Sequence, residues 1–339
     1  MDTRERYAAY ADRIAPVSSS YAAWARSLDD DLVALLDEVP EQQRQPELLF
    51  AVARRLGADP SDPGALRALG REARPALVAA LAAATVQAND PRRLGPVVPL
   101  FQALAASAGR PLGLVDAGAA AGLCSIPDRV TLDHVPARPL GSGVRTDRVR
   151  VHTAVAEPSV HLTVEVSGAA PAPRPTRIRI GARIALDPNP IDLAEPGAFD
   201  RLVEAVPPEA TDRTARMREA ARATLAAPPV RIRGALPGDL DRALDALPDG
   251  VEPVVLTTGT LVYVPGADRQ RAVDRLRERG VHWIALERTG ILSGVAATLP
   301  PDVDPADPDA FATASLDGVA AAVSDPFGVR VRWLREPDL

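Results

Sequence analysis

The sequence predicts an α/β protein in which a helical segment precedes a mostly parallel sheet. Two observations carry this prediction. Apolar residues recur at helical spacing up to about residue 110, and from residue 112 onward strand patterns alternate with helix patterns. Such alternation is typical of a parallel sheet that is covered on both faces. We therefore expect a helical N-terminal lid over 1–111 and a sheet domain over 112–339.

The helices of the first segment are predicted from caps and spacing. One helix is expected after the capping serines Ser18–Ser20, with apolar residues through Leu36. A second helix is expected to begin at Pro46 and to end before Gly57, because proline suits the first turn and glycine the position after the last. Further helices are expected over 65–86 and 95–108.

The elements of the sheet domain are predicted from apolar runs and from alternation. Short apolar runs predict strands at 112–117, 230–233, 251–258 and 281–287, and alternation predicts half-exposed strands at 147–155, 159–167 and 176–186. Helices are expected over 200–227, 238–247 and 267–279, and closing antiparallel hairpins from the strand-like segments 292–299, 313–323 and 328–334.

One pair of alternating strands is predicted to be an insertion. Residues 147–167 place polar side chains at every second position, which implies one exposed face, whereas central parallel strands are apolar on both faces. We therefore expect a β-hairpin insertion at about 141–175 that projects from the sheet.

Composition excludes several classes of protein. The net charge of −6 argues against a nucleic-acid or anionic-membrane surface. The single cysteine, Cys124, cannot form an internal disulfide, and the four histidines show no ligand spacing, so no metal site is expected. All 39 basic residues are arginine, which excludes Schiff-base and Walker A lysines. No signal peptide or membrane span is visible, so a cytoplasmic protein is expected, with a homodimer as one option.

The most informative motif is the run VDAGAAAGL at 115–123. An apolar strand ends near Asp116, Gly118 can take a positive φ that lets a ligand approach the backbone, and Gly122 permits close helix–strand packing. A helix is expected to open after this run, with an N-terminus that favours polar or anionic groups. The alternative is a tight connection made of small residues for packing alone.

This run resembles the first motif of class I S-adenosylmethionine-dependent methyltransferases, in which an acidic residue is followed by alternating glycines. Asp116, Gly118 and Gly122 match, and Ala120 stands in place of the middle glycine. The resemblance implies a Rossmann-like methyltransferase-type sheet in which these four residues bind S-adenosylmethionine.

The whole chain also resembles an uncharacterised actinobacterial family that is catalogued as a domain of unknown function. The segments that carry this resemblance are QAND (87–90) with Arg92-Arg93, VDAGAAAGL with Asp128-Arg129, ALDPNPIDL (185–193), VHWIALE (281–287) and the terminal VRWL. The chain departs from the pattern at Cys124, where asparagine is expected, and at Phe327-Gly328, where a His-Gly pair is expected.

In the methyltransferase fold an acidic residue at the end of the second strand binds the ribose hydroxyls, and Asp187 is the candidate here. It lies 65 residues beyond Gly122 rather than roughly 20, and the insertion accounts for the excess. Asp133 lies nearer to the usual spacing, but no convincing strand precedes it. A plain turn aspartate is the alternative for Asp187. The acid often found after the third strand is absent, and Ala235 stands in its place.

Contacts to a methyl acceptor are expected from the loops after the fourth and fifth strands. Thr257 and Thr258 are candidate substrate-binding residues, and Tyr263 and Glu287 are candidate catalytic residues. Glu287 could act as a general base or bind a cationic acceptor. Ordinary loop contacts are the alternative for the threonines and the tyrosine, and an ion pair with Arg288 or another arginine is the alternative for Glu287.

The junction between the two predicted parts supplies three more substrate-binding candidates, Gln87, Asn89 and Arg92. Polar residues at such a junction also serve as helix caps, which is the alternative for Asn89 and Asp90.

Three functions follow in order of preference. The first is methyl transfer from S-adenosylmethionine to a small molecule, for which positioning supplies most of the rate. The second is a non-catalytic binding or interaction protein on the same fold, favoured by the substitutions Ala120, Ala235, Cys124 and Phe327. The third is a nicotinamide-dependent oxidoreductase, against which the absence of a Tyr-x-x-x-Lys pair argues.

Overall fold

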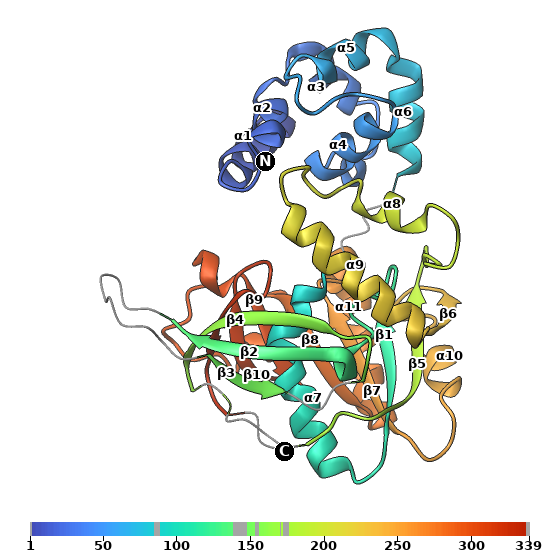
Figure 1. The fold of residues 1–339 in the computed structure, drawn as a ribbon, viewed down its shortest axis with the longest axis vertical. Helices are drawn as coiled ribbons and strands as arrows, with labels where there is room; N and C mark the ends of the chain where they lie inside the picture. Colours follow the sequence, from blue (N-terminus) through green and yellow to red (C-terminus); the bar gives the residue numbers. More distant parts are fainter. Residues whose placement is uncertain are drawn as a thin grey trace. The chain divides into compact units, whose positions relative to one another are not determined.

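A computed structural model describes residues 2–84, 89–137, 148–152, 156–169, 171 and 176–336 (Figure 1). The chain forms two compact units. A helical unit contains Met1–Ala88 and Glu195–Ala215, and a sheet unit contains Asn89–Ala194 and Arg216–Leu339. The first strand begins at Leu112, where the sequence predicts the change from helices to strands, but the two units meet at residue 89.

The helical unit is built from short helices. Ser18 caps the second of them by accepting a hydrogen bond from the Tyr21 N–H, and Pro46 occupies the first turn of α4, as predicted. The predicted run through Leu36 is broken at Ser27, and the predicted helix over 65–86 is two helices. The helices are α1 (Thr3–Ile14), α2 (Ser19–Arg26), α3 (Asp30–Leu36), η1 (Glu41–Gln43), α4 (Pro46–Arg55), α5 (Ala65–Glu72), α6 (Arg74–Ala83) and α8 (Ala198–Val203).

An aromatic cluster forms the centre of this unit. The Phe50 ring lies edge-on to the rings of Tyr21 and Trp24, with centroids 4.9 and 5.5 Å apart. Arg54 attaches the segment 195–215 to this core, because one of its nitrogens donates to the carbonyl oxygens of Glu204 and Val206. The helical unit is therefore assembled from two separate stretches of sequence.

The sheet unit contains one large mixed sheet. Its strands are β1 (Leu112–Ala117), β2 (Val130–Pro136), β3 (Val149–His152), β4 (Val160–Gly168), β5 (Ile180–Asp187), β6 (Val230–Arg233), β7 (Glu252–Thr258), β8 (His282–Arg288), β9 (Ala312–Leu316), β10 (Val319–Ser324) and β11 (Arg330–Trp333). The order is β3-β2-β4-β11-β10-β9-β8-β7-β1-β5-β6. Six of the ten neighbouring pairs are parallel, so the predicted mostly parallel sheet is confirmed.

Five strands form the parallel block of this sheet, in the order β8-β7-β1-β5-β6. Every residue of β1 is buried, as expected for a central parallel strand. Strands β9, β10 and β11 continue the sheet as antiparallel neighbours, which confirms the predicted closing hairpins. The predicted strand at 292–299 is wrong, because this segment contains the short helix α12 (Ser293–Ala296).

The predicted β-hairpin insertion is wrong. Strands β3 and β4 do not pair with each other, because β2 lies between them, antiparallel to β3 and parallel to β4. Strand β4 also pairs in parallel with β11, so it is a central strand of the same sheet. The sequence prediction missed β2, and with it the strand that contains Asp133.

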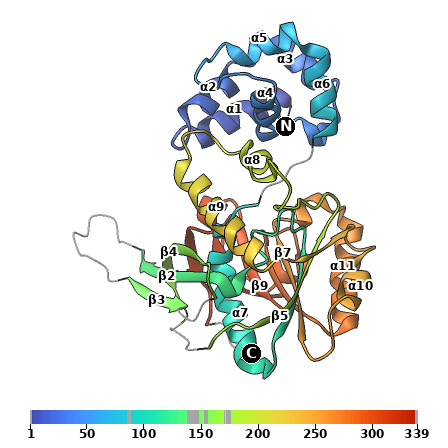
Figure 2. The same ribbon diagram turned by 45° about the vertical axis from the view of Figure 1, so that its right-hand side comes forward.

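Helices cover both faces of the parallel block (Figures 1 and 2). Helices α10 (Leu240–Asp245) and α11 (Gly266–Arg279) cover one face through a shared apolar core with β1, β5, β7 and β8. Helix α7 (Leu94–Ala108) contacts β8 and β9 and also β2, β3 and β4, so the curved sheet wraps around it. The remaining elements are η2 (Pro91–Arg93), η3 (Pro127–Arg129), α9 (Thr211–Ala226), η4 (Leu261–Tyr263) and η5 (Pro308–Ala310). The predicted helix over 200–227 is two helices, α8 and α9.

Candidate functional site

The strand order creates a topological switch point at the carboxyl end of β1. After β2, β3 and β4 have formed elsewhere in the sheet, the chain adds β5 and β6 on one side of β1 and then β7 and β8 on the other. In open α/β sheets such a point is the usual place for a ligand. The segment Ala117–Leu123, which begins at the last residue of β1, is called the glycine turn below.

The glycine turn has an unusual backbone and does not open an α-helix. Gly118, Ala120 and Gly122 all have positive φ, at 84°, 50° and 76°. Three left-handed residues at alternate positions are incompatible with a right-handed helix. The chain instead passes through turns to the 3-10 helix η3 and then to β2. The predicted helix N-terminus beside the turn is therefore wrong.

Side chains from distant segments hold the turn. The Asn89 side chain donates to the Ala119 carbonyl at 3.0 Å and accepts from the Leu123 N–H at 2.8 Å. The Thr260 hydroxyl donates to the Ala117 carbonyl at 2.9 Å. Asn89 is 3% exposed, and both of its bonds run to the turn, so its role in this structure is neither a helix cap nor an open binding group.

Asp187 ends β5 beside the turn, as predicted. One carboxylate oxygen accepts from the Ala120 N–H at 2.9 Å and the other from the Asn189 N–H at 2.7 Å. A carboxylate has about four acceptor positions, so these two bonds leave each oxygen able to accept one more. Asp187 therefore fixes the turn and keeps acceptor capacity at the switch point.

Asp116 and Glu287 are two further carboxyl groups at this edge of the sheet. Asp116 accepts from the Ser125 hydroxyl at 2.7 Å, while its Oδ1 is buried without a hydrogen-bond partner in the described chain. Burial raises the pKa of Asp116 to about 7, and the charge of Asp187 adds to this rise. Glu287 accepts from the N–H groups of Thr260 and Leu261, both at 3.1 Å, and burial raises its pKa to about 7.

Arg93 is the cation of this site, and the sequence prediction did not select it as a site residue. Its guanidinium donates to the Thr258 carbonyl at 2.7 Å, and its charge lowers the pKa of both Asp116 and Glu287. The dipeptide Arg92-Arg93 was the only available signal, and a dipeptide alone does not tell which arginine points inward.

The remaining predicted residues divide between this site and other places. Thr257 and Thr258 are buried at the end of β7, and the Thr257 hydroxyl accepts from the Trp283 indole at 3.2 Å. Tyr263 is 61% exposed in η4. Arg92 pairs with Asp90 at 2.6 Å. Gln87 lies outside the described residues.

The sequence prediction found no convincing strand before Asp133, but the structure places this residue inside a strand. It lies in the middle of β2, and its fully buried carboxylate pairs with Arg150 and His161, both at 2.8 Å. It takes no part in the glycine turn in the described structure. This position removes Asp133 as the rival of Asp187.

The described residues contain neither a metal-binding cluster nor a membrane-spanning helix. No three His, Cys, Asp or Glu side chains gather closely enough there to hold a metal ion. No helix in the described part is long and apolar enough to cross a membrane.

Comparison with known proteins assigns a family. A family model described as "Uncharacterized protein conserved in bacteria (DUF2332)" matches residues 4–333. No curated protein and no solved structure matches the chain.

Proposed function

We propose that this chain, which belongs to the bacterial DUF2332 family, transfers a methyl group from S-adenosylmethionine to a small-molecule acceptor at the switch point between β1 and β7. The observation that carries the proposal is the position of Asp187. It ends the strand next to β1, contacts the glycine turn, and retains two acceptor positions. Two neighbouring ribose hydroxyls suit such a carboxylate.

The fit of the cofactor to these residues rests on donor and acceptor chemistry. Gly118 has the positive φ that such a turn needs, and the unpartnered Oδ1 of Asp116 is an acceptor for an ammonium group. S-adenosylmethionine supplies, when bound, an activated methyl group on a sulfonium. The chain's part is to bind and orient this group and to exclude water, because methyl displacement depends on alignment.

Glu287 supplies the candidate proton acceptor. Its pKa of about 7 means that a fraction is protonated and a fraction ionised near neutral pH. A carboxyl group with such a pKa is suited to take a proton from an acceptor hydroxyl or amine. Arg93 limits the rise in this pKa and keeps the ionised form accessible.

The second candidate is a non-catalytic binding protein on the same sheet. The observation that favours it is the close contact between Thr260 and Gly118, which fills the switch point with the chain's own side chain. Under the first candidate this side chain must turn away when the cofactor binds.

A thermal-shift panel separates the two candidates. The full chain is heated with S-adenosylmethionine, S-adenosylhomocysteine or NADH at about 1 mM, and a ligand that binds only the folded state raises the Tm. The proposal expects a rise with the first two and none with NADH. No rise with any of them supports the non-catalytic candidate, and a rise with NADH alone supports an oxidoreductase.

A further inference from the structure

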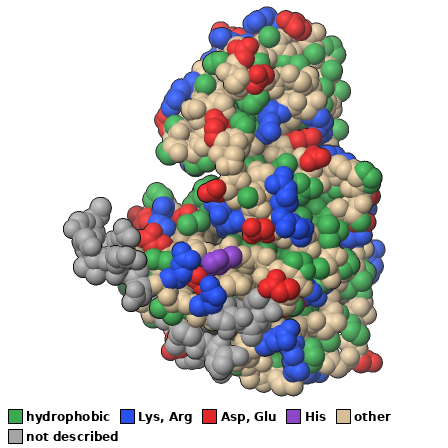
Figure 3. All heavy atoms as spheres, in the orientation of Figure 1, with side chains coloured by type: hydrophobic (Ala, Val, Ile, Leu, Met, Phe, Trp, Pro, Cys, Tyr) green, Lys and Arg blue, Asp and Glu red, His purple; other side chains and the backbone are tan. Residues whose placement is uncertain are grey.

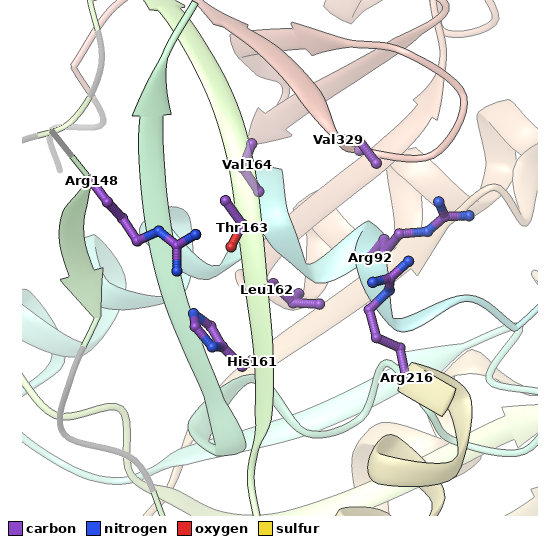
Figure 4. A pocket seen from close by; sticks show the side chains of 9 residues that line it. Arg92, Arg148, His161, Leu162, Thr163, Val164, Arg216 and Val329 are labelled. Atoms are coloured by element: carbon purple, nitrogen blue, oxygen red, sulfur yellow. The ribbon is translucent and has the colours of Figure 1, made fainter. Parts of the chain in front are cut away.

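A second feature of the sheet unit, away from the glycine turn, is a cavity of about 310 Å³ beside β4. Its wall contains three arginines and a histidine from four segments of the chain (Figure 4). The lining residues are Arg92, Arg148, His161, Leu162, Thr163, Val164, Arg216, Gly328 and Val329, and this set is called the arginine pocket below.

The cavity exists because two neighbouring strands differ in length. Strand β4 begins at Val160, but its pairing with β11 begins only at Glu165. The Glu165 N–H donates to the Val329 carbonyl at 2.8 Å, and before it no described strand pairs with β4 on that side. An unpaired strand edge presents backbone N–H and C=O groups. The arginine pocket therefore offers backbone groups as well as side chains.

Arg216 is the clearest sign that the pocket receives a ligand. It projects from α9 into the cavity, and its Nε is buried without a hydrogen-bond partner in the described chain. No ion pair of Arg216 is found among the described residues either. Buried donors normally have partners, so the Nε of Arg216 is a donor available to an acceptor from outside the chain.

The other two arginines are paired, but the pocket keeps an excess of positive charge. Asp90 pairs with Arg92. Asp133 pairs with Arg148 at 3.3 Å. With Arg216 included, the three arginines of the wall face two carboxylates, which leaves one positive charge in excess. Arginine and histidine side chains also gather over β2 and β4 on the face drawn in Figure 3.

The neighbouring carboxylate of Asp325 is held by backbone groups rather than by an arginine of the wall. Asp325 precedes the loop that ends the pocket, and its Oδ1 accepts from the backbone N–H groups of Val329 and Arg330. The charge of Asp325 acts on Arg330, which lies outside the pocket wall.

We propose that the arginine pocket binds a small phosphate monoester. Three arginines and a histidine line the wall, and arginine donors are suited to phosphate oxygens. Leu162, Val164 and Val329 provide apolar wall for the organic part of such a ligand. The volume is in the lower part of the range of small-molecule sites.

The test is calorimetric titration of the full chain with phenyl phosphate at low ionic strength and pH about 7.5. Wild type is expected to bind, and Arg216→Gln to bind at least tenfold more weakly, because one charge-assisted hydrogen bond has about that effect. Arg222→Gln is the matched control, since Arg222 lies exposed on the same helix outside the pocket. It is expected to leave the affinity within about twofold.

Benzoate tests the choice of phosphate, because it carries one negative charge instead of two. It is expected to bind wild type at least tenfold more weakly than phenyl phosphate does. Equal affinity for the two probes overturns the phosphate assignment. Absence of phenyl phosphate binding at about 10 mM, or equal effects of the two arginine substitutions, overturns the site itself.

This test does not depend on the proposed methyl transfer. Arg216 makes no described contact with the glycine turn, so Arg216→Gln leaves binding of S-adenosylhomocysteine unchanged in either case. A failure of one proposal therefore remains distinguishable from a failure of the other.

Discussion

The side chain of Thr260 occupies the space that a Cβ atom on Gly118 would need. Such a Cβ would lie 2.1 Å from the Thr260 hydroxyl oxygen, and that hydroxyl is fixed by its bond to the Ala117 carbonyl. The loop after β7 is thus in direct contact with the turn after β1. Glycine at position 118 is required by this packing as well as by its φ of 84°.

We predict that Gly118→Ala destabilises the protein by about 2–4 kcal/mol, from backbone strain and overpacking together. A Thr260→Ala background removes the two closest contacts and leaves the Thr260 Cβ at 2.8 Å, so the cost of Gly118→Ala should fall toward the backbone strain of about 1–2 kcal/mol. Urea unfolding of the two single variants and the double variant measures this coupling. An equal cost of Gly118→Ala in both backgrounds would show that the contact with Thr260 is unimportant.

The two hydrogen bonds of the Asn89 side chain predict a second effect on stability. Asn89→Ala leaves the buried Ala119 carbonyl and Leu123 N–H without their partner, which should cost about 2–4 kcal/mol for two groups. Asn189→Ala is the control, because the Asn189 side chain accepts from Arg233 at the surface, and it should cost less than about 1 kcal/mol. Chemical denaturation compares the two variants, and similar losses of unfolding free energy would contradict this role of Asn89.

The carboxyl group of Asp116 predicts how stability changes with pH. Its folded pKa, about 7, is above the unfolded value of about 3.9, so the native state binds more protons between these values. Asp116 therefore makes the free energy of unfolding decrease as pH rises from about 4 to about 7. Asp116→Asn should be less destabilising, or more stabilising, at pH 8 than at pH 5. A pH-independent difference between the two proteins would rule out this titration.

Asp133 should make the free energy of unfolding change with pH in the opposite direction. Burial raises its pKa, but hydrogen bonds from Arg150 and His161 more than offset this and hold the pKa below its ordinary value. Its contribution to stability is present above the unfolded pKa and is lost as pH falls through the lower folded pKa. Asp133→Asn should therefore be destabilising at pH 7, with a difference that shrinks below about pH 4. Unfolding curves at both pH values test this, and a constant difference would contradict it.

Local sequence signals predicted much of the parallel block but not the pairing of the other strands. Residues 112–117 and 230–233 form strands with the predicted bounds, because each segment is short and lies between a proline and a glycine. Strand β2 was missed, since Asp133 and His134 interrupt its apolar pattern and are buried there. Asp133 is compatible with a strand only because β3 and β4 bring basic partners, and such long-range pairing is invisible in a local window.

The same limit applies to the candidate site. Asp187 and Glu287 were selected from their places at strand ends, and Asn89 from the family resemblance and its place at the junction. All three lie close to the carboxyl end of the parallel block. Their partners are backbone groups of other loops, which residue types do not reveal. The positive φ of Ala120 was equally hidden, because alanine rarely adopts it and Asp187 holds it there.

The measurement that tests the central claim most directly is calorimetric titration of the full chain with S-adenosylhomocysteine. The account predicts binding by wild type below about 1 mM. Asp187→Asn should weaken this binding by about tenfold or more, because hydrogen bonds to a charged group contribute about 1.5–3 kcal/mol. Asp133→Asn should leave it within about twofold. No heat of binding at millimolar S-adenosylhomocysteine, or a larger loss from Asp133→Asn than from Asp187→Asn, would contradict a cofactor site at the glycine turn.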